Sequence, residues 1–215
     1  KNIEIFMKEP KLNKRLLKLL YDHKEEHVGS CFTCLDIIDN IFAKKNKDDI
    51  FILSNGHAAY ALYSIIEKYH NIDADYLAKK HGGHPNLDEA NNIYCSTGSL
   101  GSGIIIAVGR ALGNPNRKVY VTISDGECAE GSVWEALRFI EDYGLKNIEV
   151  HVNCNGWACY DTIDVNVLEK RLKAFLPSIH IHKTNFNRLS FLKGLDSHYM
   201  ILNEDQYKQG RKELA

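Results

Sequence analysis

Residues 119–155 read VYVTISDGECAEGSVWEALRFIEDYGLKNIEVHVNCN. The β-branched run 118–123 predicts a buried strand, and the turn Ser124-Asp125-Gly126-Glu127 follows it. A helix is expected over 132–143 and a further strand over 148–152. Ligands of a parallel sheet bind beyond the carboxyl ends of its strands. We therefore expect Asp125 and Asn155, each just past such an end, to be close neighbours.

The rest of the chain continues this alternation of helices and strands. Apolar spacing predicts further helices over 12–26, 33–45 and 58–69, and a short buried strand over 49–53. Thr33 is the expected N-cap of the second helix, after a break at 27–30. Glycine and proline predict loops at 81–86, 96–103 and 114–116, with an apolar helix between the last two. The prediction is one α/β domain over 1–215, with a parallel sheet flanked by helices on both faces.

Composition excludes several classes of protein. The 215 residues are 44% apolar and 26% charged, which is typical of globular chains. Lys plus Arg number 27 against 28 for Asp plus Glu, so a basic nucleic-acid-binding surface is not expected. The longest apolar run, 104–108, is far shorter than the about 20 residues of a membrane span. No signal-peptide pattern opens the sequence, so we expect a cytoplasmic protein without membrane contact.

Six cysteines are present, and without a secretory signal free thiols are favoured over disulfides. Cys31 and Cys34 form a lone C-x-x-C pair. A zinc site would need a second ligand pair, and no comparable pair follows in the sequence. The two cysteines are therefore interpreted as small core residues.

Asp125 and Asn155 are candidate metal ligands. Mg²⁺ takes an octahedral shell of oxygens and often uses one or two protein side chains plus phosphates. A carboxylate, an amide oxygen and a nearby backbone carbonyl would supply half of that shell, and Gly126 would let the backbone approach a phosphate. The alternative is an ordinary βαβ unit whose turn residues serve folding alone.

This spacing resembles the thiamine diphosphate motif, in which a Gly-Asp-Gly triplet precedes an Asn-Asn or Asp-Asn pair. Ser124 and Cys154 replace the first member of the triplet and of the pair. The resemblance implies thiamine diphosphate as cofactor and Mg²⁺ or Ca²⁺ as metal. It assigns the metal to Asp125, Asn155 and the carbonyl of Trp157.

Further segments resemble the transketolase family in their order along the chain. They cover the range from about 11 to 175 and are His27-Val-Gly, Leu53-Ser-Asn-Gly-His57, Gly83-His-Pro85, Ser96-Thr-Gly-Ser-Leu-Gly-Ser-Gly103 and Asp125-Gly-Glu-x-x-Glu-Gly-x-x-Trp-Glu-Ala136. Ser99 stands where the family usually has proline. The resemblance implies the thiamine-diphosphate-binding fold, in its diphosphate-binding (PP-type) form.

The resemblance also implies roles for individual residues. His27 and His84 would contact hydroxyls of the ketose donor, and His57 would reach the diphosphate end of the cofactor. The remaining residues that it assigns to the cofactor are Gly98, Ser99, Leu100, Gly126, Glu127 and Asn155. Glu130 would join a carboxylate network between paired active sites. Taken singly, each histidine is an ordinary core or surface residue, Gly98 and Leu100 serve helix entry and packing, and Glu130 is a first-turn helix acid.

The implied reaction is transfer of a two-carbon ketol unit from a sugar phosphate or related ketose to an aldehyde. In this family a following pyrimidine-binding domain carries the activating glutamate, and 1–215 holds no such domain. We expect a split enzyme whose partner is a C-terminal transketolase subunit, with two copies of each chain. His198 is a candidate for a family histidine that bridges diphosphate and substrate, although the segment 171–194 before it is shorter than usual. The alternatives are a deoxyxylulose-phosphate synthase, a 2-oxo-acid dehydrogenase α-chain, or a non-catalytic subunit.

Overall fold

The computed structural model describes residues 10–215. These residues contain a parallel sheet with the strand order β1-β2-β3-β4. Its strands are β1 (Ile50–Leu53), β2 (Val119–Ser124), β3 (Ile148–Cys154) and β4 (His180–Lys183). The parallel α/β fold predicted from the sequence is confirmed, and β2 and β3 are neighbours with Ser124 opposite Asn153.

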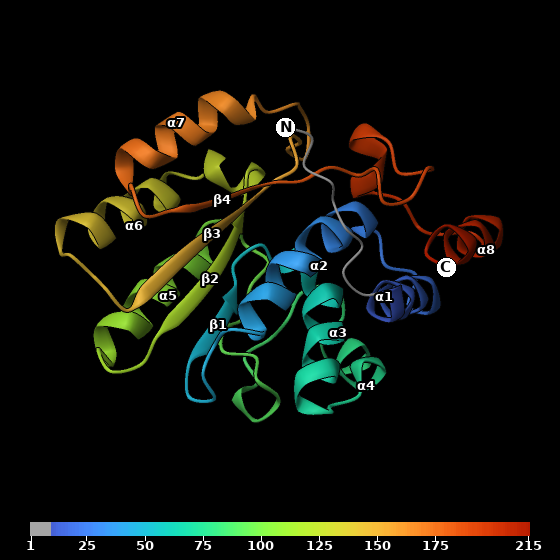
Figure 1. The fold of residues 1–215 in the computed structure, drawn as a ribbon, viewed down its shortest axis with the longest axis horizontal. Helices are drawn as coiled ribbons and strands as arrows, with labels where there is room; N and C mark the ends of the chain where they lie inside the picture. Colours follow the sequence, from blue (N-terminus) through green and yellow to red (C-terminus); the bar gives the residue numbers. More distant parts are fainter. Residues whose placement is uncertain (1–9) are drawn as a thin grey trace.

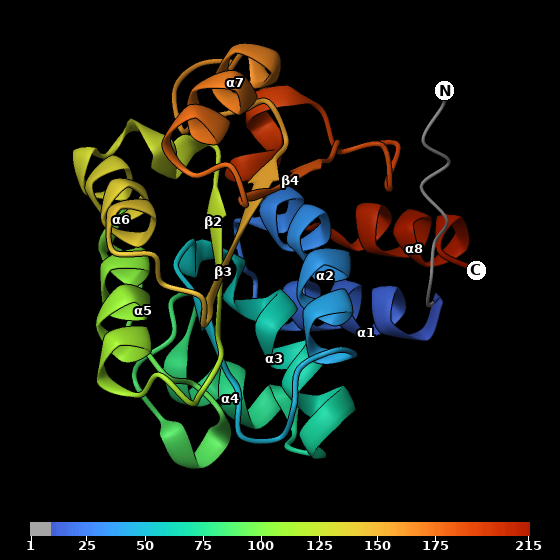
Figure 2. The ribbon, with the colours of Figure 1, turned by 60° about the vertical axis from the view of Figure 1, so that its left-hand side comes forward.

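Helices cover both faces of the sheet (Figures 1 and 2). On one face lie α1 (Pro10–Asp22), α2 (Val28–Phe42), α3 (Ala59–His70), α4 (Ala74–His81) and α8 (Glu204–Glu213). On the other lie α5 (Ser102–Gly113), α6 (Gly131–Asp142) and α7 (Val165–Phe175). Strand residues alternate between the two cores, as a pleated strand requires. In β1, Phe51 and Leu53 enter the first core and Ile50 and Ile52 enter the second.

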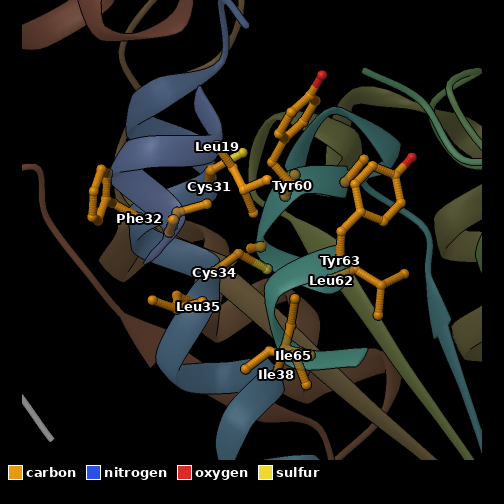
Figure 3. Close-up of a cluster of buried hydrophobic side chains, with 14 of the residues drawn as sticks. Leu19, Cys31, Phe32, Cys34, Leu35, Ile38, Tyr60, Leu62, Tyr63 and Ile65 are labelled. Carbon is orange, nitrogen blue, oxygen red and sulfur yellow. The ribbon is translucent and has the colours of Figure 1, made fainter. Parts of the chain in front are cut away.

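The two cysteines of the C-x-x-C pair lie in the core between α2 and α3. Cys31 and Cys34 are fully buried free thiols, packed among apolar side chains of both helices (Figure 3). Burial raises the pKa of the Cys34 thiol to about 12. Both cysteines therefore stay protonated and apolar, and their interpretation as core residues is confirmed.

The predicted start of α2 is wrong. The helix begins at Val28 rather than after Thr33, and Thr33 is a buried interior residue whose hydroxyl donates to the Ser30 carbonyl. Gly29 does not break the helix, because it is a close-packing residue in the first turn. A Cβ at Gly29 would lie 2.8 Å from atoms of Phe186 and Ser197.

Several elements were not predicted from apolar spacing. Helix α4 begins at an Asp73 cap that accepts from Asp75 N, and α8 begins with a capping box between Asn203 and Gln206. Helix α7 and the short, partly exposed edge strand β4 were also missed. Across residues 10–215 the longest apolar helices still fall short of what crossing a bilayer needs.

Candidate functional site

The site lies where β2 and β3 end, at the tips of their arrows in Figure 2. Asp125 follows β2 directly, and Asn155 follows β3. The Asp125 carboxylate accepts from Gly126 N at 3.0 Å and from Gly156 N at 2.7 Å. The carboxylate thus ties the two strand tips together, and the predicted closeness of Asp125 and Asn155 is confirmed.

Asp125 is 2% exposed, and its ionisation reflects that burial. Burial raises the pKa of the carboxyl to about 6, although the backbone N–H groups of Gly156 and Gly126 act in the opposite direction. A cation beside this carboxylate would favour its charged form.

The neighbouring oxygens suit such a cation. The Asn155 side-chain oxygen accepts from Trp157 N at 3.0 Å and keeps a second lone pair. The Trp157 carbonyl lies 3.6 Å from the position that a Cβ on Gly126 would take, so glycine leaves this space open. A carboxylate, an amide oxygen and a backbone carbonyl are the donors that a hard cation such as Mg²⁺ prefers, and this donor set fits the implied metal.

Imidazoles gather beside these oxygens in a narrow pocket. The pocket is lined by His27, His57, Leu100, Ser124, Asp125, Gly126, Asn155, Trp157, Ala158, Cys159, His198 and Tyr199. The ring centroid of His27 lies 5.4 Å from that of His57 and 5.9 Å from that of His84. Three histidines from segments far apart in the sequence therefore meet at one place.

Burial favours the neutral form of two of these histidines, His57 and His84. Burial, followed by the nearby histidines, lowers the pKa of His57 to about 3. Burial and the neighbouring His27 likewise lower the pKa of the His84 imidazole. His27 Nδ1 lies 3.2 Å from the Glu25 carboxylate. Burial alone would raise the pKa of Glu25, but its contacts with His27 outweigh this and lower it. Glu25 is therefore a charged partner that orients the His27 ring.

His198 lines the same pocket. From the sequence it was only a candidate site residue. It ends a 3₁₀ turn (Gly194–His198), and its Nδ1 lies 3.2 Å from Ser30 Oγ. The Nε2 atom is buried and has no hydrogen-bond partner among the described residues. Because a buried polar atom without a partner is costly, this orphaned nitrogen fits a site that is completed by a ligand.

Tyr199 is a pocket residue that sequence reasoning missed. It is exposed, and its hydroxyl donates to the Cys159 carbonyl at 3.2 Å. Its only sequence signal is its position next to His198. The hydrogen bond joins the end of the 3₁₀ turn to the loop after β3.

Some predicted residues do not line the pocket itself. Glu127 is fully buried and accepts from Ser54 Oγ at 2.5 Å and Gly101 N at 2.7 Å. Ser99 and Glu130 are exposed, the latter at the start of α6. Gly98 has φ +148° and lies against His84, so that a Cβ on Gly98 would be 3.1 Å from the imidazole ring. The ring of His84 is in turn next to that of His27, which lines the pocket. Contacts of these residues with a cofactor or a second subunit stay predictions.

Acid is expected to destabilise the chain partly through His198. Burial, followed by the nearby His27, lowers its pKa from 6.5 to about 4. As pH falls, the imidazole of His198 is therefore protonated in the unfolded chain at a higher pH than in the folded chain. The contribution of the neutral, buried ring to the free energy of unfolding is complete above about pH 6.5 and is lost as pH falls toward 4. Between about pH 7 and 5 this residue should account for about 1–2 kcal/mol of lost unfolding free energy.

Urea unfolding at several pH values checks this expectation. The His198→Asn variant should lose less stability on acidification than the wild-type chain. Equal pH dependence of the two proteins would show that another group is responsible.

The fold and the site define a class of protein, a parallel α/β domain with a pocket at the carboxyl edge of its sheet, where ligands of such sheets bind. Residues 37–178 match the family described as transketolase, thiamine diphosphate binding domain. The chain belongs to this family. Its sequence is 25% identical over 262 residues to a protein of Phocaeicola vulgatus named as an apulose-4-phosphate transketolase subunit, and the match covers 97% of this chain and 93% of that protein.

Other relatives are longer than this chain. Human transketolase is 30% identical over 174 residues, which cover 69% of this chain and 28% of that protein. Among solved structures, transketolase from Campylobacter jejuni has a TM-score of 0.76 at 21% identity, and the match covers 100% of this chain and 43% of that one. The chain thus corresponds to less than half of a whole transketolase and to most of a protein named as a subunit.

Proposed function

We propose that this chain is the diphosphate-binding part of a transketolase-like enzyme that transfers a two-carbon ketol unit between a ketose and an aldehyde. The observation that carries the proposal is the pocket at the sheet edge. It is lined by Asp125 and Asn155 together with the imidazoles of His27, His57 and His198. The family match supports thiamine diphosphate as the cofactor. Two relatives named as subunits of an apulose-4-phosphate transketolase support a sugar phosphate as the substrate.

In this proposal each residue of the chain has a binding or proton-holding role. Asp125, Asn155 and the Trp157 carbonyl would hold Mg²⁺, and through it the diphosphate. When bound, thiamine diphosphate supplies the carbanion chemistry that breaks and forms the carbon–carbon bond. His27 and His84 would hold sugar hydroxyls, and the neutral His57 and His198 would hydrogen-bond the cofactor–substrate region. Leu100 would exclude water from one side of the pocket.

The proposal includes a second chain or segment that carries the pyrimidine-binding domain. Helix α5 begins just after the Leu100 loop and exposes Ile105 (47%), Ile106 (41%) and Leu112 (46%). Exposed apolar side chains on a helix that begins next to the pocket support a partner that completes the site. Two copies of each chain remain part of the proposal.

Reconstitution tests the proposal. The chain is mixed with a pyrimidine-domain subunit of a related split enzyme, thiamine diphosphate and Mg²⁺, and ketol transfer from phosphorylated ketoses is measured. We expect transfer only when both chains are present. In a parallel melting experiment, cofactor at about 100 times its dissociation constant should stabilise the pair by about 2.7 kcal/mol.

The outcomes separate the alternatives. Cofactor binding without cleavage of any ketose would contradict the transferase activity but keep the cofactor. Consumption of pyruvate would instead indicate a synthase or 2-oxo-acid dehydrogenase. Absence of cofactor-dependent stabilisation would indicate a non-catalytic subunit.

A further inference from the structure

A second cluster of potential ligands lies on the sheet, away from the cofactor pocket. Glu149 and His151 are on β3, and His180 and His182 are on the edge strand β4, where His180 pairs with His151. Each strand's side chains alternate between the two faces, so these residues share the face that carries Tyr120. None of them lines the pocket at the strand tips.

We propose that Glu149, His151 and His180 bind a divalent transition-metal ion, Zn²⁺, and thereby join β3 to β4. One ligand atom from each of the three residues lies within 4.8 Å of the others. His151 Nε2 and Glu149 Oε2 are 3.4 Å apart. Tetrahedral zinc with bonds near 2.0–2.1 Å holds neighbouring ligand atoms about 3.3 Å apart. This pair therefore already has the spacing of two zinc ligands.

The buried histidine of the cluster is oriented for metal binding. His151 is 8% exposed, and its Nδ1 lies 3.0 Å from His182 Nε2. When Nδ1 donates its proton to His182, Nε2 keeps a free lone pair. Among the described residues this buried Nε2 has no hydrogen-bond partner. A metal-bound histidine typically donates its other N–H to an outer acceptor, and His182 Nε2 would be that acceptor for His151.

The charges around the cluster are also compatible with a metal. Lys118 contacts Glu149 Oε1, which leaves Oε2 facing His151. This contact with Lys118 also fixes the carboxylate in place. Burial, followed by the neighbouring histidines, lowers the pKa of His151 to about 4, so its ring is neutral as a ligand must be.

His180 is the adjustable member of the cluster. Its ring stacks on that of His151 with centroids 4.6 Å apart, and the residue is exposed. Movement of an exposed ring would bring the third ligand into range without disturbing the core, and water would occupy the fourth position. The bound ion would strengthen β4, which is held to the sheet along four residues only.

Zinc titration of the full chain tests the inference. Excess Mg²⁺ is present throughout so that the Asp125 site does not compete. We expect one Zn²⁺ per chain, with a rise in melting temperature, and Co²⁺ in its place should give the visible absorption of a tetrahedral ion. His180→Ala should weaken binding at least about tenfold, and His182→Ala about tenfold, since outer partners of metal ligands contribute 10–100-fold.

Matched controls keep the result interpretable. His180 is exposed, so its alanine variant should fold like the wild-type chain. His70→Ala removes a histidine whose ring also has a buried, unpartnered Nε2 but which lies outside the ligand cluster, and it should leave zinc affinity unchanged. Unchanged affinity in His180→Ala, or loss of zinc in Asp125→Ala instead, would overturn the proposal. Neither result would bear on the proposed ketol transfer, which is measured with Mg²⁺.

Discussion

Replacing Glu127 by alanine is expected to lower the free energy of unfolding by about 4 kcal/mol. The carboxylate is fully buried and accepts from Ser54 Oγ, Gly101 N and Ser124 N. Burial raises the pKa of Glu127, while the hydrogen bonds from Ser54 and Gly101 act against this. Alanine would leave three buried donors without an acceptor, and each unsatisfied group costs about 1–3 kcal/mol.

The physical reason lies in where these donors come from. Ser54 follows β1, Gly101 precedes α5, and Ser124 ends β2. Glu127 therefore joins three segments that meet beside the pocket. Its loss should loosen the Leu100 loop as well as the fold.

Urea denaturation measures this effect, with Glu130→Ala as the matched control. Glu130 is an exposed glutamate three residues further on, so its alanine variant should change stability by no more than about 0.5 kcal/mol. Glu127→Gln should be intermediate, because one of its amide N–H groups would face a backbone donor. An unchanged midpoint for Glu127→Ala would contradict the assignment of this carboxylate as the link between the three segments.

Replacing Asp125 by alanine is expected to weaken binding of thiamine diphosphate with Mg²⁺ by at least about 100-fold. Even outer partners of metal ligands contribute 10–100-fold, and Asp125 is the charged ligand of the proposed site. Alanine also removes the acceptor of Gly156 N, which holds the β3 tip beside the β2 tip. The loss of the charge and the loss of this hydrogen bond should both weaken binding of the cation and of the phosphates that it holds.

Asp125→Asn separates binding from folding. Asparagine keeps the shape of the side chain and one acceptor oxygen but removes the charge. Burial disfavours the charged carboxylate in the absence of a cation, but the asparagine NH2 would face one of the two backbone donors, Gly126 N or Gly156 N. Without cofactor, this variant should therefore melt closer to the wild-type chain than Asp125→Ala does. Cofactor-dependent stabilisation should nevertheless be lost, as measured by melting curves of the reconstituted pair. Wild-type cofactor affinity in both variants would rule out Asp125 as a metal ligand.

Local patterns in the sequence were sufficient for much of the fold. The β-branched run before Asp125 and the apolar run 148–152 predicted β2 and β3, and parallel pairing then placed Asp125 near Asn155. Such predictions succeed because strand and turn preferences depend on residues a few positions apart. The same reasoning failed at the start of α2, where Gly29 and Ser30 suggested a break. There, Phe186 and Ser197 pack so close to the first turn of α2 that a Cβ on Gly29 would lie 2.8 Å from their atoms, so the glycine serves close packing and not a break.

The sequence by itself therefore determined the α/β class, the closeness of Asp125 and Asn155 at the sheet edge and the loop that carries His84. Only the tertiary structure decided that Glu127 faces the interior rather than the pocket, that His198 reaches Ser30, and that His151 meets His180 and His182. Ser30 and His198 are 168 positions apart, and Glu127 and Ser54 are 73 apart. Contacts at such separations depend on how the helices and strands pack together, and no periodicity along the chain carries that information.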